Sequence, residues 1–441
     1  MEKDLTIGDP FKVIVLFSLP IIGGNLFQLL YTLADTVIVG QVLGSDALAA
    51  VGSTGIIIYL VLCFVQGITG GFGICLGHQF GRRDEIGMRQ SATASFLLSA
   101  AAGILITLLS CGLAHPILKW MNTPQAIYDM AYDYMFVVLL GTGATVFYNL
   151  ISNLLRALGD SRTPLIFLIV SSVLNIVLDY LFMAPFRMGV TGAALATVLS
   201  QLISAGLCIR RGYRQFAVLR LGRKDFSLPG KVLKTHLRIG FPMGFQMSVM
   251  CIGQIAMQGA VNALGAAAIA GYTAATKVDQ VSVLVNTALG VAVSGFVAQN
   301  YGAHKPERIR AGVRSCLLLA AAGNLAMCAA ILLCRNLVIP LFVSDPAKEL
   351  YPYANLYFFS VAPFYVLLGV LIIIRSSVQS MGNSKAPFCA CMAELVIRIC
   401  ATTLLAGKIG YVGICLATPL AWMGAIAVLA PQYHKCYTGS R

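Results

Sequence analysis

The sequence predicts an all-α integral membrane protein of twelve transmembrane helices, arranged as two six-helix lobes that are related by a pseudo-two-fold axis along the membrane normal. Three observations predict this fold: a shortage of charged residues, a series of long apolar stretches and an internal repeat. Charged residues make up 11% of the 441-residue chain, whereas hydrophobic residues make up 58%. Soluble domains carry about 25% charged residues, so most of this chain is suited to a hydrocarbon environment.

Each predicted helix corresponds to one apolar stretch. A helix needs about 20 apolar residues to cross about 30 Å of hydrocarbon. The sequence contains twelve stretches of this kind, six in each half of the chain. In chain order they cover residues 13–39, 48–77, 91–113, 131–155, 164–185, 190–209, 239–263, 266–297, 315–343, 353–374, 386–406 and 411–432. The longest polar stretch is too short to form a soluble domain, so we expect the function to reside among the helices.

The two halves of the chain repeat the same outline of glycines and prolines, with an offset of 221 to 223 residues. The pairs are Pro20 and Pro242, Gly44 and Gly265, Gly81 and Gly302, Gly159 and Gly382, Pro164 and Pro387, Gly189 and Gly410, and Gly192 and Gly413. A fixed period of this size indicates duplication of a whole domain. We therefore expect an amino-terminal lobe at 1–210, a cytoplasmic linker at 211–235 and a carboxy-terminal lobe at 236–441. Such a duplicated membrane protein points first to a transporter, because a binding site can form between two similar lobes.

Positive charge is distributed unevenly between the two sides of the predicted topology. Of the 31 Lys and Arg residues, 24 fall on one side, Arg375 among them, and five fall on the other. The positive-inside rule then predicts a multi-pass protein of the cell inner (plasma) membrane with both termini in the cytoplasm. Because this placement accounts for the net charge of +14, we expect no nucleic-acid partner. Six spans per repeat return the chain to its starting side, so the two repeats have parallel orientation.

Other classes of site find little support. The thirteen cysteines include no C-x-x-C pair, which predicts reduced thiols that pack as small apolar side chains. The five histidines show no metal-ligand spacing and no Ser/His/Asp grouping, and this argues against an enzyme. We expect no cofactor. The residues from Met1 to Pro20 lack a small-residue cleavage site and do not resemble a signal peptide.

Two acidic residues fall within the apolar stretches of the first half. Asp35 lies in the outer part of the first stretch and Asp179 in the fifth, and no Lys or Arg lies deep in that half to neutralise them. Asn175 precedes Asp179 by four residues, so both face one side of a helix, and Thr197 in the sixth stretch adds a hydroxyl. Ionisable groups at membrane depth are functional candidates. The alternative is that both acids lie near the interface and only contact water.

If these helices converge, the two carboxylates would titrate as a unit and could share one proton. Binding of H⁺ or Na⁺ would change the local charge, which is the kind of event that biases a bistable element. Pro20 precedes Asp35 by about four turns of the same helix, and an interior proline permits a kink. We therefore expect the charge state of Asp35 to change the bend of this helix. No metal site is predicted other than a possible Na⁺ site at Asp35 and Asp179.

Polar residues of the second half are harder to assign. Lys277 and Asp279 lie in the eighth stretch, where Lys277 either balances Asp279 or lines an inner cavity. Glu394 and Arg398 are four residues apart in a favourable order, so they either compensate each other or contact substrate. The seventh stretch contains no acid but three glutamines. The residues that we predict to line a substrate cavity are Lys277, Asp279, Gln254 and Gln258.

Several motifs together resemble the multidrug and toxic compound extrusion (MATE) transporters. The first helix contains Pro20, the run from Tyr31 to Thr36, Gly40 and Gly44 in the order typical of that family. Paired loop motifs also resemble theirs: Gln79-Phe80-Gly81 with Gln299-Asn300-Tyr301-Gly302, and Arg156-Ala157-Leu158-Gly159-Asp160 with Gln379-Ser380-Met381-Gly382-Asn383. The segment from Asn175 to Asp179, followed by Gly192 to Thr197, is similar to the DinF-type branch.

This resemblance implies a twelve-helix transporter with two six-helix lobes around a central cavity, working by alternating access. Members export bulky, often cationic, amphipathic compounds in exchange for H⁺ or Na⁺. By position, Asp35, Asn175, Asp179 and Thr197 would be the cation-coupling residues. The partners implied are small organic molecules, often cations, and the lipid bilayer, and we expect a monomer. Another branch places acids in the seventh and tenth spans, which this chain lacks.

Two alternatives of different class remain at this point. A flippase for lipid-linked sugars would need an Arg or Lys cluster at cavity depth, and Lys277 with Arg398 provides only a small one. An integral membrane enzyme would need a catalytic His or a paired acid and base at the bilayer edge. Carboxylates, an amide and a hydroxyl suit both H⁺ and Na⁺, so the sequence leaves the coupling ion open.

Overall fold

The computed structural model describes residues 4–338 and 350–438, and within these ranges all regular elements are helices. The α-helices are α1 (Pro10–Leu43), α2 (Ser45–Arg82), α3 (Glu85–Trp120), α4 (Gln125–Leu140), α5 (Thr142–Ala157), α6 (Arg162–Met183), α7 (Gly189–Gln215), α8 (Gly230–Asn262), α9 (Ala266–Gly302), α10 (Pro306–Val338), α11 (Leu350–Val361), α12 (Tyr365–Ser380), α13 (Lys385–Ile409) and α14 (Tyr411–Thr438). Short 3₁₀ turns occur at η1 (Ala217–Leu219), η2 (Arg223–Phe226) and η4 (Ala362–Phe364).

The predicted set of membrane spans is confirmed. Among the described residues, eleven helical segments are long and apolar enough to cross a membrane, and the bent pair α4 and α5 brings the number to twelve. The fourth span differs from the prediction of one helix over 131–155, because α4 and α5 meet at a bend of 43°. A side chain at Gly141, between them, would collide with Val198 of α7. The bend therefore accompanies a close approach of α7 that the apolar pattern does not encode.

The internal repeat is visible in the backbone. Three of the predicted glycine pairs adopt positive φ in both halves, with nearly equal values within each pair. The φ angles are 87° and 97° for Gly44 and Gly265, 87° and 87° for Gly159 and Gly382, and 60° and 59° for Gly189 and Gly410. Glycine adopts this conformation without the steric cost that a Cβ atom brings. These positions join successive helices, which explains why glycine occurs there in both halves.

The chain divides into two compact units. One contains Leu19–Gly244, and the other contains Leu5–Ser18 and Phe245–Arg441. This division differs from lobes at 1–210 and 236–441, because the first part of α1 belongs with the carboxy-terminal unit and the first part of α8 with the amino-terminal unit. Each helix changes unit close to a proline, Pro20 in α1 and Pro242 in α8.

Hydrogen bonds explain why the residues before Leu19 belong to the carboxy-terminal unit. The backbone N–H of Leu5 donates to Oε1 of Gln299 at 2.9 Å. Lys305 donates to the carbonyl of Thr6 at 3.0 Å, and Arg308 donates to that of Ile7 at 2.9 Å. The start of the chain is thus anchored to the ends of α9 and α10.

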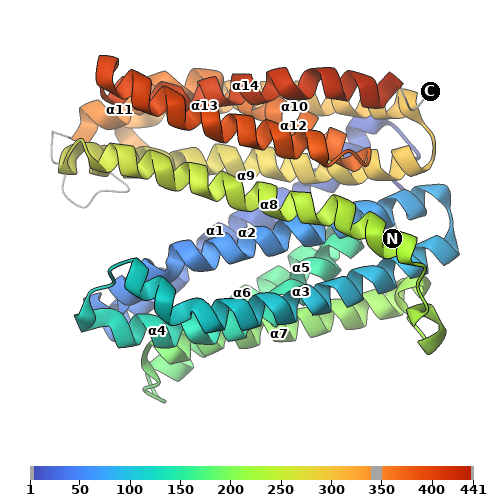
Figure 1. Cartoon of the computed structure of the whole chain (residues 1–441), viewed down its shortest axis with the longest axis horizontal. Coiled ribbons are helices and arrows are strands. Elements are labelled where there is room, and N and C mark those ends of the chain that lie inside the picture. The colour runs from blue at the N-terminus through green and yellow to red at the C-terminus, as the bar shows by residue number, and fades with distance from the viewer. Residues whose placement is uncertain (1–3, 339–349, 439–441) are drawn as a thin grey trace. The chain divides into compact units, whose positions relative to one another are not determined.

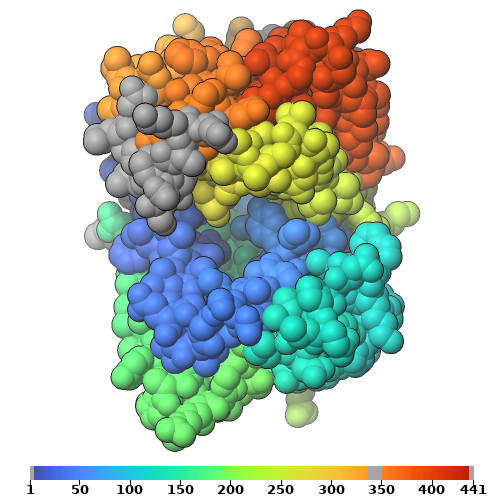
Figure 2. Space-filling model, turned by 90° about the vertical axis from the view of Figure 1, so that its left-hand side faces the viewer, coloured from blue at the N-terminus to red at the C-terminus, as the bar shows by residue number. Residues whose placement is uncertain are grey.

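Within each unit the long helices run roughly parallel to one another (Figure 1). In the amino-terminal unit, α2 packs against α4 and α5, and α6 packs against α7. Figure 2 shows one end of these helices, where the turn from α1 to α2 lies beside the turn from α3 to α4. In the carboxy-terminal unit, α13 packs against α14 and α9 against α12.

Glycines make a close helix contact in the amino-terminal unit. Gly67 and Gly71 of α2 face Gly240 and Gly244 of α8, and both pairs are spaced by four residues. An ideal Cβ at Gly71 would lie 2.5 Å from the Cα of Gly240, and one at Gly67 would lie 2.7 Å from the Cα of Gly244. Small residues at this spacing let helix backbones meet. The structure therefore assigns α8 as the partner of this glycine motif.

We expect Gly71→Ala to lower the free energy of unfolding by about 1–3 kcal/mol, because the added methyl group pushes α8 away from α2. Gly70→Ala is the matched control, since a Cβ there would lie 3.7 Å from Cε of Met243, an ordinary contact. The melting temperature of each purified variant in detergent measures the difference. Equal melting temperatures for the two variants would contradict the glycine contact.

Candidate functional site

The two acids of the first half lie together in the amino-terminal unit. The carboxyl groups of Asp35 in α1 and Asp179 in α6 are hydrogen-bonded to each other. Asp179 is fully buried and Asp35 is half-buried. An ionised carboxylate only accepts hydrogen bonds, so this contact requires a proton on one of the two groups. The pair can therefore hold a proton between α1 and α6.

The other two predicted residues surround this acid pair. Asn175, which is 0% exposed, is oriented with its NH₂ group toward Asp179, because this assignment satisfies both ends of the amide. It donates to Oδ2 of Asp179 at 2.8 Å and accepts from the backbone N–H of Thr197 at 3.2 Å. Asn175 thereby connects α6 to α7. The structure brings together all four residues that the sequence singled out.

Two tyrosines complete the site. The Tyr31 side chain is hydrogen-bonded to the side chain of Thr197. The Tyr134 side chain, in α4, interacts electrostatically with both Asp35 and Asp179. Tyr31 precedes Asp35 by four residues, so its position on the same helix face could have been read from the sequence. Tyr134 could not, because only the packing of α4 in three dimensions brings it close.

The site contains acceptor oxygens without a basic partner. None of the ion pairs found in residues 4–338 and 350–438 includes Asp35 or Asp179. One oxygen of each carboxyl group, Oδ1, is buried and has no hydrogen-bond donor within the described part of the chain. No cluster of three or more His, Cys, Asp or Glu suited to a metal occurs in those ranges. The chemistry of the site fits one small cation, either H⁺ or Na⁺, held by hard oxygen atoms.

Substitution of Asn175 by alanine tests the connection between α6 and α7. We expect Asn175→Ala to lower the free energy of unfolding by about 1–3 kcal/mol, because the buried Asp179 loses a donor and a backbone N–H loses its acceptor. Val177→Ala on the same helix is the control, since Val177 is 56% exposed. Thermal unfolding in detergent compares the two, and an Asn175→Ala variant as stable as the control would rule out this connection.

The assignment of the four residues of the second half to a cavity stays a prediction. Lys277 and Gln254 are exposed, and Gln258 donates to Asn262 at 2.9 Å. Asp279 accepts from the hydroxyl of Tyr357 at 3.2 Å. No hydrogen bond or ion pair recorded among the described residues joins these four side chains. The apolar pattern placed them on helices but could not assign their orientation.

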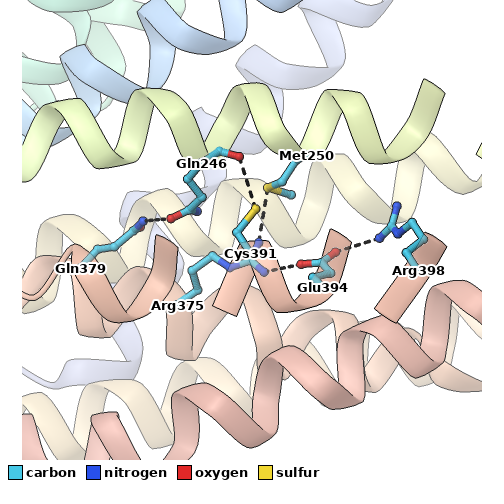
Figure 3. A network of polar contacts seen from close by, with 7 residues as sticks. All are labelled: Gln246, Met250, Arg375, Gln379, Cys391, Glu394 and Arg398. Carbon is cyan, nitrogen blue, oxygen red and sulfur yellow. Dashed lines mark hydrogen bonds and ion pairs between the residues drawn. The ribbon is translucent and has the colours of Figure 1, made fainter. Parts of the chain in front are cut away.

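A second polar network lies in the carboxy-terminal unit (Figure 3). Glu394 of α13 accepts from Arg375 of α12 at 2.6 Å and from Arg398 at 2.8 Å. Arg375 also contacts Sδ of Met250 at 3.4 Å. The network extends to a buried glutamine pair, in which Gln379 donates to Gln246 at 2.6 Å. The predicted pair of Glu394 and Arg398 is therefore part of a larger cluster.

Arg375 corrects the sequence interpretation, which counted it among the cytoplasmic charges. It is only 5% exposed and belongs to α12, which continues to Ser380. The predicted span ended at residue 374 because a charge interrupts the apolar run there. A charge that is paired inside the protein does not end a helix. The signal that could have found it is the acidic Glu394 in the next predicted span.

We expect Glu394→Gln to lower the free energy of unfolding by about 3–5 kcal/mol, since two guanidinium groups would lose their shared carboxylate. Arg398→Gln should be milder, because Glu394 keeps Arg375 as its partner. Melting temperatures of the two purified variants decide between these outcomes. If Arg398→Gln proved as damaging as Glu394→Gln, the central position of Glu394 in the network would be wrong.

Comparison with known proteins agrees with this architecture. The family model described as MatE matches the chain twice, over residues 20–181 and 242–404. The chain is 30% identical over 426 residues to the probable multidrug resistance protein YpnP of Bacillus subtilis, covering 95% of this chain and 94% of that protein. It is 25% identical over 387 residues to the probable multidrug resistance protein NorM of Thermotoga maritima, covering 85% and 81%. A solved structure of a multidrug resistance MATE family transporter in an outward-facing conformation is 25% identical, with a TM-score of 0.92 and coverage of 99% and 98%.

Proposed function

Because the chain belongs to the MATE family, we propose that it is a cation-coupled antiporter, which exports amphipathic, often cationic, organic compounds by alternating access. Members of this family are multi-pass membrane transporters for small molecules, and the relatives of this chain include multidrug resistance and multidrug export proteins. The chain is therefore a transporter of the multidrug efflux type and not an enzyme. Placement in the plasma membrane with cytoplasmic termini is supported by the excess of Lys and Arg on one predicted side.

The observation that supports cation coupling is the hydrogen bond between Asp35 and Asp179. Loss of the shared proton would leave two carboxylates in contact without a basic neighbour, and like charges at this distance repel. A Na⁺ ion between them would restore attraction. Ion binding and release would therefore change the contact between α1 and α6, which is a local charge event that can bias two conformations.

Pro20 provides a route from this contact to a larger motion. It lies inside α1, where a proline removes one backbone hydrogen bond and permits bending, and it lies where α1 passes from one compact unit to the other. We infer that a change of contact at Asp35 alters the bend of α1 at Pro20. The residues before Pro20 remain anchored to α9 and α10, while the part of α1 after Pro20 changes its direction.

A flippase for lipid-linked sugars is the second candidate. The buried guanidinium groups of Arg375 and Arg398 favour it, since phosphate is recognised by cationic donors. Both groups contact Glu394, however, so one carboxylate already compensates part of their charge. Transport of an anionic lipid that needs no ion gradient would favour the flippase over the antiporter.

Asp35→Asn tests the antiporter. Asparagine can still donate a hydrogen bond to Asp179, so we expect the variant to fold but to lose ethidium export driven by an imposed H⁺ or Na⁺ gradient in proteoliposomes. Asp129→Asn, which changes an exposed acid of α4, should transport as the unchanged protein does. Applying the two gradients separately identifies the coupling ion. Full gradient-driven export by Asp35→Asn would refute the proposal.

A further inference from the structure

The network around Glu394 has more positive than negative charge. Two guanidinium groups share one carboxylate, and Arg375 and Glu394 are each only 5% exposed. Asp279, another acid of this unit, accepts from the hydroxyl of Tyr357 and forms no ion pair with a guanidinium among the described residues. One positive charge of the network therefore has no carboxylate in contact with it among the described residues.

The network also contains unused hydrogen-bond donors. Nε of Arg375 and Nε of Arg398 are buried, and neither has an acceptor in the described ranges. Glu394 bonds only Nη2 of Arg398, and Figure 3 shows the other terminal nitrogen of Arg398 turned away from Glu394. Buried donors without partners are unfavourable, and more so when the group is charged. An anionic oxygen would satisfy them.

The helix facing these donors, α8, contributes adaptable side chains. Gln246, Met250, Gly253 and Met257 recur at helical spacing on α8, and each contacts α12 or α13. Nη1 of Arg398 lies 3.8 Å from the point where a side chain at Gly253 would begin. Gly253 itself contributes no side chain against Arg398. Methionine is unbranched and flexible, so Met250 and Met257 can adjust to a bound group.

We propose that Arg398, supported by Arg375 and Glu394, binds a carboxylate group of the exported molecule in the carboxy-terminal unit. Arginine presents a planar set of donors that matches carboxylate oxygens, and Glu394 holds the guanidinium in place while its remaining hydrogens contact the ligand. The cargo class then includes amphipathic molecules that contain a carboxylate, zwitterions among them, in addition to simple cations. This assignment rests on the proposed export function and specifies its substrate.

Two dyes that differ in a single group provide the test. Rhodamine 110 has a free carboxylate, and rhodamine 123 is its methyl ester. We expect the purified full chain in detergent to bind rhodamine 110 more tightly, as measured by fluorescence polarisation. Arg398→Gln should weaken binding of rhodamine 110 about tenfold, the effect of losing one charge-assisted hydrogen bond, and leave that of rhodamine 123 nearly unchanged. Arg398→Lys should restore part of the preference.

Lys408→Gln is the matched control, because it removes one positive charge from an exposed position of the same helix and should not alter the preference. Equal binding of the two dyes, binding of neither, or an equal loss for both in Arg398→Gln would overturn the proposal. Displacement of rhodamine 110 alone by phosphatidylglycerol would assign the site to lipid phosphate and also overturn it. The assay applies no ion gradient, so a failure of ion coupling would appear in the proteoliposome experiment and not here.

Discussion

The hydrogen bond between the carboxyl groups of Asp35 and Asp179 is the interaction on which the candidate mechanism depends. It joins α1 to α6 only while a proton or another small cation lies between two acids that have no basic partner in the described structure. Asn175 connects Asp179 to α7, so the proposed mechanism places the rearrangement at the pair in α1. In this proposal α1 is the movable side of the site and α6 is the fixed side.

The movable side belongs to a helix, α1, that contributes residues to both compact units. α1 begins in one compact unit, where Gln299 and Lys305 hold the backbone that precedes it, and it presents Asp35 in the other. α8 changes unit in the same way near Pro242, and Gly240 and Gly244 fix its first part against α2. In each half, one helix therefore belongs to both units and contains a proline near the change. In the proposed mechanism, a charge event at Asp35 would be transmitted along a continuous helix rather than through a chain of side chains.

Much of this architecture could be predicted from the sequence because it follows from solvent and backbone constraints. Hydrocarbon thickness fixes the length of the apolar stretches, and positive φ fixes the glycines that repeat between the halves. The sequence singled out Asp35 and Asp179 as acids at membrane depth, but it left open whether their helices converge, because that depends on packing in three dimensions. The bend at Gly141 and the burial of Arg375 were missed because both depend on neighbours far away in the sequence, Val198 and Glu394. The assignment of Gln254 and Gln258 to a cavity stays a prediction.

Gene duplication produced two copies of one helix pair with opposite electrostatics. At the offset of 223 residues that relates Gly159 to Gly382, Asn175 corresponds to Arg398 and Asp179 to Thr402. The position that orients an acid in the amino-terminal unit is thus occupied by a guanidinium group in the carboxy-terminal unit, where it meets Glu394 instead. A structural ion pair alone would need only one arginine, whereas this unit places two around one buried acid. In the two proposals made above, the amino-terminal unit binds a small cation and the carboxy-terminal unit binds an anionic group, and a transporter that exchanges one for the other would gain from keeping the two sites on separate units.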